Sequence, residues 1–149
     1  MARKPPRTDF SFNAESLLAE MPTVSYICEN DEFYTMRYIS SSILLTLGYQ
    51  ADEFIDNAKV FAASVAHPED LETIDAFAES LLSTRQTMTA RVRLVRRDGT
   101  VFPCLLVSRA ICHPKTGEAV AFSGTVVDIS GEPGLQGPTG ILTKPNQTG

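Results

Sequence analysis

The most regular pattern of apolar and polar positions lies between Pro68 and Ser83, where apolar side chains recur every three or four residues. The apolar positions are Leu71, Ile74, Phe77, Ala78, Leu81 and Leu82. Proline presets a helical φ, and the carboxylates at positions 69, 70 and 72 favour the positive end of a helix. The segment therefore predicts an amphipathic helix with one buried face.

Beyond Thr84 the apolar period falls to two residues. Ala90, Val92 and Leu94 alternate with arginines, which indicates a strand with one buried side. The Asp98-Gly99 dipeptide predicts a hairpin turn, because glycine adopts the positive φ that such turns require. The run 101–113 then predicts a long strand that is apolar on both sides, and 120–129 predicts the last strand.

The first part of the chain completes the pattern. Alternation over 24–29 and the aromatic and branched residues of 34–39 predict two strands that pair as a hairpin. Short helices are expected over 12–21, over 43–47 before Gly48, and between 51 and 65. This order predicts an α+β fold, in which a five-stranded antiparallel sheet carries short helices and one longer helix on one face.

Composition changes at both ends of the chain. Residues 131–149 hold five of the nine glycines and three of the nine prolines, which predicts a Gly/Pro-rich flexible tail. The first residues combine three basic side chains with two adjacent prolines. We therefore expect a flexible segment over 1–13, a single folded domain over 14–130, and the tail over 131–149.

Charge and cysteine content narrow the classes of function. A net charge of -5 opposes a nucleic-acid partner, because phosphate binding needs a basic face. No apolar run is long enough to span a membrane or to serve as a signal peptide, so a cytoplasmic protein with no membrane partner is expected. Cys28, Cys104 and Cys112 match no zinc or redox spacing and are expected to be reduced, buried thiols.

Several short motifs occur in an order typical of one family. They are Tyr34-Thr-Met-Arg-Tyr-Ile-Ser40 with Leu47-Gly48-Tyr49, His67-Pro-Glu-Asp70, Asp98-Gly-Thr100 with Phe102-Pro103, and Asp128-Ile-Ser130. Over residues 14–130 the chain resembles the PAS domain family of sensory modules. The resemblance favours a register in which the side chains of Phe102, Cys104, Leu106 and Ser108 point inward.

The resemblance also implies which cofactors to test. Flavin photoreceptors of the family carry a reactive cysteine on a helix, whereas all three cysteines here lie on predicted strands. Haem-binding members carry a histidine on or after the long helix, and 71–94 contains none. No cofactor is therefore identified, flavin and haem are not expected, and no metal site is expected. Relatives are often fused to histidine kinase or diguanylate cyclase domains, and such domains are absent from this sequence. His67 and His113 also lie outside any motif typical of a catalytic nucleophile. No enzymatic activity and no catalytic residue are therefore predicted.

An apolar pocket for an unidentified small ligand is the main functional hypothesis, although the same side chains could simply fill the core. The available polar anchors are Tyr26, Tyr38, Ser108 and Ser123. The pocket candidates are Tyr26, Met36, Tyr38, Ile43, Leu47, Phe61, Ile74, Phe77, Val92, Cys104, Leu106, Phe122, Gly124 and Val126.

A second hypothesis concerns the outer face of the sheet. An apolar outer face needs a cover, which could be the N-terminal helix, a second copy of the chain, or a signalling partner protein. The interface candidates are Leu17, Leu18, Met21, Leu105, Val107 and Ile111. Two functions therefore stay open: a sensory module that binds a small ligand and relays a signal through dimerisation or partner docking, and a ligand-free interaction module.

Overall fold

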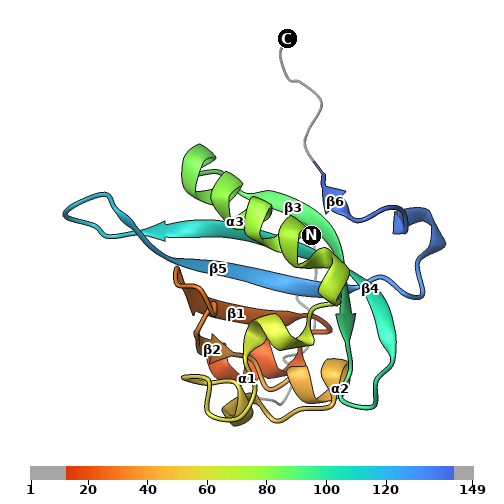
Figure 1. Cartoon of the computed structure of the whole chain (residues 1–149). Coiled ribbons are helices and arrows are strands. Elements are labelled where there is room, and N and C mark those ends of the chain that lie inside the picture. The colour runs from red at the N-terminus through yellow and green to blue at the C-terminus, as the bar shows by residue number, and fades with distance from the viewer. Residues whose placement is uncertain (1–12, 143–149) are drawn as a thin grey trace, which may run out of the picture.

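The computed structural model describes residues 13–142 as an antiparallel sheet with helices packed against it (Figure 1). The six strands are β1 (Val24–Glu29), β2 (Met36–Ile39), β3 (Met88–Val95), β4 (Val101–Cys112), β5 (Ala119–Asp128) and β6 (Gly140–Ile141). They lie in the order β2-β1-β5-β4-β3-β6, and all neighbours are antiparallel. The predicted α+β class is confirmed, with one short strand more than expected.

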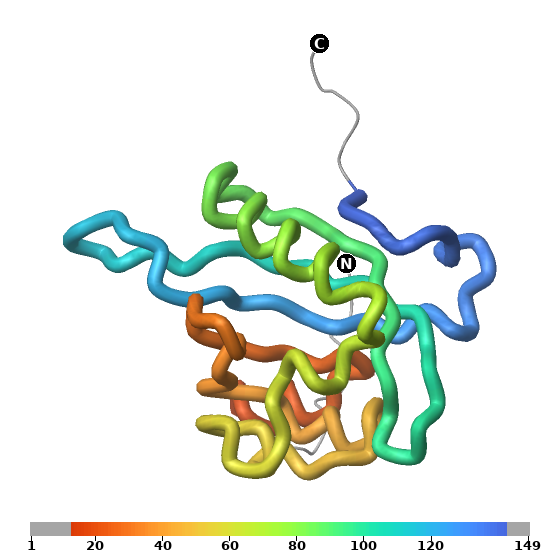
Figure 2. The backbone as a smooth tube through the Cα atoms, viewed as in Figure 1, coloured from red at the N-terminus to blue at the C-terminus, as the bar shows by residue number. Residues whose placement is uncertain are grey.

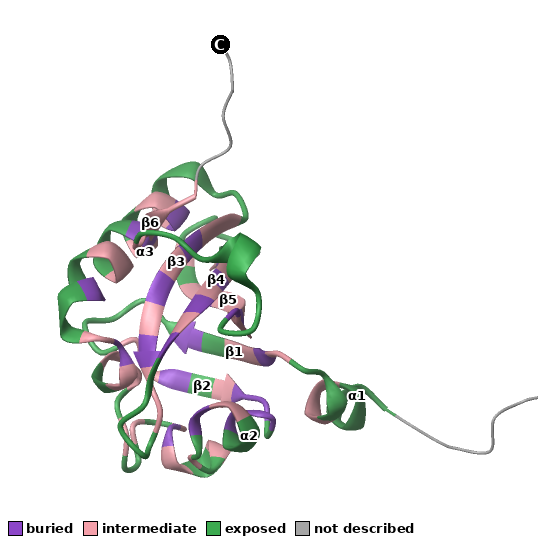
Figure 3. Ribbon diagram, turned by 90° about the vertical axis from the view of Figure 1, so that its right-hand side faces the viewer, coloured by how far each residue is buried: buried purple, intermediate pink, exposed green. Residues whose placement is uncertain are grey.

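The longest helix, α3 (Leu71–Thr84), crosses the sheet, and the 3-10 turn η3 (Pro68–Asp70) leads into it beside β3. The helix α2 (Ile43–Leu47) and the 3-10 turns η1 (Ala51–Glu53) and η2 (Ala62–Val65) lie in the chain between β2 and η3. The remaining pieces are α1 (Ala14–Glu20) and the 3-10 turn η4 (Pro133–Leu135). Figure 3 shows α1 apart from α2 and α3, beyond the start of β1. The short N-terminal helix was expected, but it does not join the helices on the inner face.

The start of α3 follows the predicted signals. Pro68 opens η3, and the Nδ1 atom of His67 accepts a hydrogen bond from the backbone N–H of Glu69 at 3.1 Å. At the other end, Arg85 adopts a left-handed φ of 57° and its N–H bonds to the carbonyl of Leu81. Phe77 and Leu81 are buried on the face that meets the sheet. The helix is therefore fixed by its end signals and by one apolar stripe.

The hairpin between β3 and β4 sets the register of the central strands. Gly99 has a φ of 91°, and Asp98 accepts a hydrogen bond from the Thr100 N–H at 2.9 Å. Burial then alternates along β4, where Phe102, Cys104, Leu106 and Ser108 are buried. The predicted inward register of β4 is confirmed. Because β3, β4 and β5 are neighbours, their inward side chains form one continuous floor for the core.

The first part of the expected flexible tail is ordered against the sheet. The segment turns back from β5 and passes beside β3 (Figure 2), where β6 pairs with Ala90 and Arg91. The Arg91 guanidinium donates to the carbonyls of Leu135 at 2.9 Å and Pro138 at 3.2 Å. Residues 131–142 thus pack against the β3 edge, whose free backbone groups offer partners that composition does not reveal. Residues 143–149, like 1–12, lie outside the described residues.

The cysteines lie on strands, as expected, but not all are buried. Cys28 and Cys104 are buried, and burial raises the pKa of each thiol to about 12. Cys112 is exposed near the end of β4, which corrects the expectation of three buried thiols. None of the helices within residues 13–142 combines the length and apolar character needed to cross a lipid bilayer.

Candidate functional site

A cavity of about 120 Å³ lies between the inner face of the sheet, α3, α2 and the η2 segment. Its walls are almost entirely carbon, as is typical of small-molecule sites that recognise apolar groups. Nine of the predicted pocket residues line it: Tyr26, Met36, Ile43, Leu47, Ile74, Phe77, Leu106, Phe122 and Val126. The structure thus brings together the predicted residues from β1, β2, β4, β5, α2 and α3.

Five pocket candidates do not line the cavity. Val92 and Cys104 are fully buried elsewhere in the core, and Phe61 is 46% exposed, where it stacks on Phe33. Gly124 borders the outer groove and carries no side chain, although a Cβ at this position would point toward Tyr26 and Ser108. Tyr38 lies in a groove on the outer face of the sheet.

A β-bulge explains the error at Tyr38. In the β1–β2 ladder, Cys28 pairs with Met36 but Ile27 pairs with Tyr38, so Arg37 is an extra residue on β2. One extra residue reverses the inward and outward positions that follow it. Ile39 therefore takes the inner position next to Tyr26, and strict alternation from Met36 could not have found this.

Sequence reasoning did not name twelve further residues that line the cavity. They lie in the β1–β2 hairpin, at Phe54, in and after η2, on α3 and on β3. Alanine contributes little to a hydrophobic pattern, so the pattern could not show which alanines line the cavity. The missed residues are Val24, Cys28, Tyr34, Ile39, Phe54, Ala62, Ala63, Val65, Ala66, Ala78, Leu81 and Leu94.

A polar pair lies at the cavity floor. Tyr26, Gly124 and Ser108 are direct neighbours across β1, β5 and β4. The Tyr26 hydroxyl and Ser108 Oγ are 2.5 Å apart and hydrogen-bonded, and Ser108 is only 2% exposed. Burial raises the pKa of Tyr26 well above its usual value, although the Ser108 bond opposes this shift. Of the four predicted anchors, Tyr26 and Ser108 line the cavity and also border the outer groove, whereas Tyr38 and Ser123 lie only at the outer groove.

The β1–β2 loop is held against the segments that close the cavity. Tyr34, which lines the cavity, has a left-handed φ of 51° and donates its hydroxyl to Asp75 on α3 at 2.5 Å. Next to it, the rings of Phe33 and Phe61 stack with centroids 5.4 Å apart. Two side-chain contacts therefore connect this loop to α3 and to the residue before η2.

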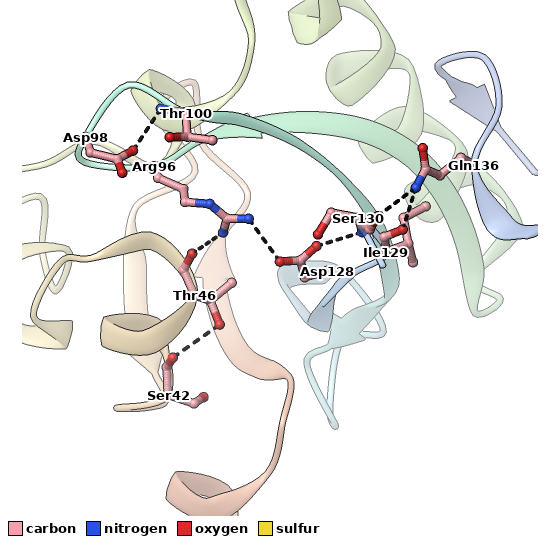
Figure 4. Close-up of polar contacts among 9 residues, drawn as sticks. All are labelled: Ser42, Thr46, Arg96, Asp98, Thr100, Asp128, Ile129, Ser130 and Gln136. Carbon is pink, nitrogen blue, oxygen red and sulfur yellow. Dashed lines mark hydrogen bonds and ion pairs between the residues drawn. The ribbon is translucent and has the colours of Figure 1, made fainter. Parts of the chain in front are cut away.

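A polar junction connects α2 to the chain that follows β5 (Figure 4). The Arg96 guanidinium donates to the Thr46 carbonyl at 2.6 Å and to the Asp128 carboxylate at 3.2 Å, and it lies over the Phe102 ring. Asp128 also accepts from the Ser130 N–H at 2.8 Å. Partial burial alone would raise the pKa of Asp128, but the Ser130 and Arg96 contacts hold it below its usual value. The motif residues Asp128 and Ser130 thus have a structural role at the end of the sheet.

Asp70 connects the start of α3, β3 and the C-terminal segment. Its carboxylate is 1% exposed and accepts from the Arg93 N–H at 2.7 Å, from the Arg93 guanidinium at 2.6 Å, and from the Thr139 hydroxyl at 3.2 Å. Burial would raise the pKa of Asp70, but these donors and the Arg93 charge hold it below its usual value. Asp70 is therefore a buried carboxylate that is fully engaged in holding three segments together.

The two histidines serve as turn caps. His67 caps η3, and Nδ1 of His113 accepts backbone N–H groups of Lys115 and Thr116 at 3.1 and 3.3 Å in the β4–β5 hairpin. Within residues 13–142, no group of three or more His, Cys, Asp or Glu side chains could hold a metal ion.

The predicted interface residues lie on or near the outer face of the sheet. Leu18 on α1 and Val107 on β4 line the outer groove with Ile27 and Tyr38. Leu105 and Ile111 share the partly exposed side of β4, while Leu17 and Met21 are 54% and 39% exposed. The hydroxyl oxygens of Tyr38 and Thr125 are buried at this groove and have no hydrogen-bond partner among residues 13–142. The helix α1 therefore reaches the sheet through Leu18 and leaves Leu17 and Met21 exposed.

Several solved structures have the same fold as this chain, although no curated protein matches its sequence. A PAS domain from Colwellia psychrerythraea superposes with a TM-score of 0.67 at 15% identity, covering 78% of this chain and 94% of that chain. The N-terminal domain of a diguanylate cyclase with PAS/PAC sensor from Marinobacter aquaeolei gives 0.61 at 24% identity, covering 74% and 97%. A light-oxygen-voltage domain studied with a flavin analogue gives 0.59 at 18% identity, covering 77% and 83%.

The family model described as "PAS fold" matches residues 36–126, a range that contains β2, α2, α3, β3, β4 and nearly all of β5. The match includes most of the cavity walls and both the start and the end of the long helix. On this basis the chain belongs to the PAS fold family, the class of sensory modules that its motifs had indicated.

Proposed function

We propose that this PAS-fold domain senses a small, mostly apolar ligand in the cavity and relays its presence to a partner or to a second copy of the chain. The single observation that carries the proposal is the carbon-lined cavity of about 120 Å³. A cavity of roughly 150 Å³ with similar walls stays dry and binds benzene. A ligand of about six non-hydrogen atoms is therefore the appropriate size.

The cavity lining favours a ligand other than flavin or haem. A flavin carries several carbonyl and N–H groups and a phosphate, whereas the walls hold no amide, basic or acidic side chain and no histidine. The volume is also below the roughly 300 Å³ at which drug-sized sites begin. Both features support a ligand other than the flavin of light-oxygen-voltage domains.

The proposed relay starts at α2. Ile43 and Leu47 line the cavity, and the neighbouring Thr46 carbonyl accepts a hydrogen bond from Arg96. Arg96 donates to Asp128, which accepts a hydrogen bond from the Ser130 N–H (Figure 4). A ligand that moves α2 would therefore bias the geometry of the chain after β5.

Thermal melts with benzene test the ligand hypothesis. At tenfold excess over its Kd, a bound ligand adds about 1.4 kcal/mol to the free energy of unfolding. Ala78 lies in the cavity wall and Ala76 on the exposed side of the same helix. Ala78→Leu should fill the cavity and abolish the benzene-induced rise in Tm, whereas Ala76→Leu should retain it. No rise in Tm for the wild type at saturating benzene would contradict ligand sensing.

The second candidate function is a ligand-free module for dimerisation or protein docking. The outer groove favours it, because Leu18 and apolar strand residues line it, Leu17 and Met21 are exposed on the same helix, and two buried hydroxyls at the groove have no partner among residues 13–142. Sedimentation of the wild type at micromolar concentration, with and without benzene, separates the two functions. A stable dimer that no small probe perturbs would favour the interaction module.

A further inference from the structure

One hydrogen of the hydroxyl pair at the cavity floor forms no hydrogen bond. Tyr26 and Ser108 each carry one O–H donor, and one of these hydrogens forms the bond between their oxygens. Within residues 13–142 neither oxygen has a second hydrogen-bond partner. Both residues line the cavity, and Ser108 is 2% exposed. One buried O–H hydrogen therefore remains without an acceptor, and burying such a donor is costly unless something accepts it.

Gly124 makes this arrangement possible. A Cβ at position 124 would lie 2.2 Å from Ser108 Oγ and 2.7 Å from the Tyr26 hydroxyl oxygen. The two side chains therefore meet directly above the glycine, in the one row of the floor where the middle strand carries no side chain. Burial also raises the pKa of Tyr26, so the phenol stays protonated and the pair keeps both hydrogens at neutral pH.

We propose that the Tyr26–Ser108 pair is the polar anchor of the ligand site, and that the natural ligand is a neutral, compact molecule with a single hydrogen-bond acceptor oxygen, such as a small ketone, aldehyde or ether. This inference rests on the proposed function. The remaining walls are apolar apart from the weakly polar Cys28 thiol and the Tyr34 hydroxyl, whose hydrogen is already donated to Asp75, so a second polar group on the ligand would lack a strong partner. The volume of about 120 Å³ limits the ligand to roughly the size of benzene.

Two probes of the same shape test the anchor. Cyclopentanone and methylenecyclopentane have equal numbers of non-hydrogen atoms and differ only in C=O against C=CH₂. Their Kd values for the purified full chain are measured by NMR titration. The wild type should bind the ketone about 3- to 10-fold more tightly than the alkene, which corresponds to the net contribution of one hydrogen bond to binding.

Removing both hydroxyls supplies the decisive comparison. In the Tyr26→Phe/Ser108→Ala variant the ratio of the two Kd values should fall to about one, while the alkene still binds. Replacing both partners of a buried bond by apolar groups is nearly neutral for folding, and a thermal melt checks this. Ser123→Ala removes a hydroxyl from the outer groove and should leave the ratio unchanged.

The outcomes separate this inference from the proposed function. Equal affinities of the wild type for both probes, or a ketone preference that survives in the double variant, would overturn the anchor and leave the cavity intact. Binding of neither probe to the wild type would overturn the ligand cavity itself, and the anchor with it.

Discussion

Gly124→Ala tests the geometry of the cavity floor most sharply. Elsewhere in a strand the change from glycine to alanine stabilises by about 0.4–1 kcal/mol, because alanine loses less conformational entropy on folding. At position 124 the added Cβ would lie 2.2 Å from Ser108 Oγ, 2.7 Å from the Tyr26 hydroxyl oxygen and 2.8 Å from Tyr26 Cζ. The structure therefore predicts that Gly124→Ala lowers the free energy of unfolding.

The cost follows from these contacts. Ser108 Oγ would have to move by roughly 1 Å to restore ordinary van der Waals contact, and the rigid Tyr26 ring would have to tilt. The Tyr26–Ser108 bond would break, at about 1 kcal/mol, and overpacking adds about 1–3 kcal/mol. After subtracting the entropic gain, the free energy of unfolding should fall by about 2 kcal/mol, which lowers Tm by roughly 5–10 °C.

Urea denaturation and thermal melts measure this change against a matched variant. Gly131→Ala is the control, since a Cβ there would meet nothing within 4 Å, and its stability should stay within about 0.5 kcal/mol of the wild type. If Gly124→Ala were neutral or stabilising, Tyr26 and Ser108 would not meet above Gly124, and the account of the cavity floor would be refuted.

Three further predictions concern other parts of the fold. Truncation after Ser130 removes the β6 pairing, the two Arg91 bonds and the Thr139–Asp70 bond, so Tm should fall by several degrees relative to a chain truncated after Leu142; equal Tm values would show that 131–142 does not stabilise the sheet. The pKa of Asp70 is lowered in the folded state, so its stabilising contribution is present at neutral pH and is lost as the pH falls below about 4. Asp70→Asn should cost about 2 kcal/mol at pH 7 and flatten the acid limb of the stability curve, whereas an unchanged acid limb would contradict this role of Asp70. If the outer groove holds a second copy, Val107→Glu should convert a dimer into a folded monomer in sedimentation, and a wild type that is already monomeric at micromolar concentration would contradict a dimer there.

The sequence predicted those features that depend on local patterns. The long helix follows from Pro68 and a single apolar stripe. The Asp98-Gly99 turn left the register of β4 open, and the family resemblance favoured the inward register that the structure has. Nine wall residues of the cavity were named because inward strand positions and the helix stripe face the same core. Patterns of period two and 3.6 were sufficient for the helix and for these wall residues.

Features that depend on tertiary contacts were not predictable. The extra residue Arg37 reverses the parity of β2 and moves Tyr38 to the outer face. The composition of 131–142 indicates flexibility, yet Arg91 and the free β3 edge order it. Tyr26 and Ser108 are 82 residues apart in the chain, and their bond depends on a glycine in the strand between them. Each case requires knowledge of which strands are neighbours.

An NMR titration of the ¹⁵N-labelled full chain with benzene tests the central claim, that the cavity is a ligand site coupled to the end of the sheet. The account predicts saturable shifts of the Ile74 and Phe77 amides in the cavity wall, and shifts with the same Kd at Ser130 and Gln136, where the chain leaves β5. Ala78→Leu should remove both sets of shifts. Shifts confined to the cavity would contradict the relay, and the absence of any saturable shift at Ile74 and Phe77 would contradict the ligand site.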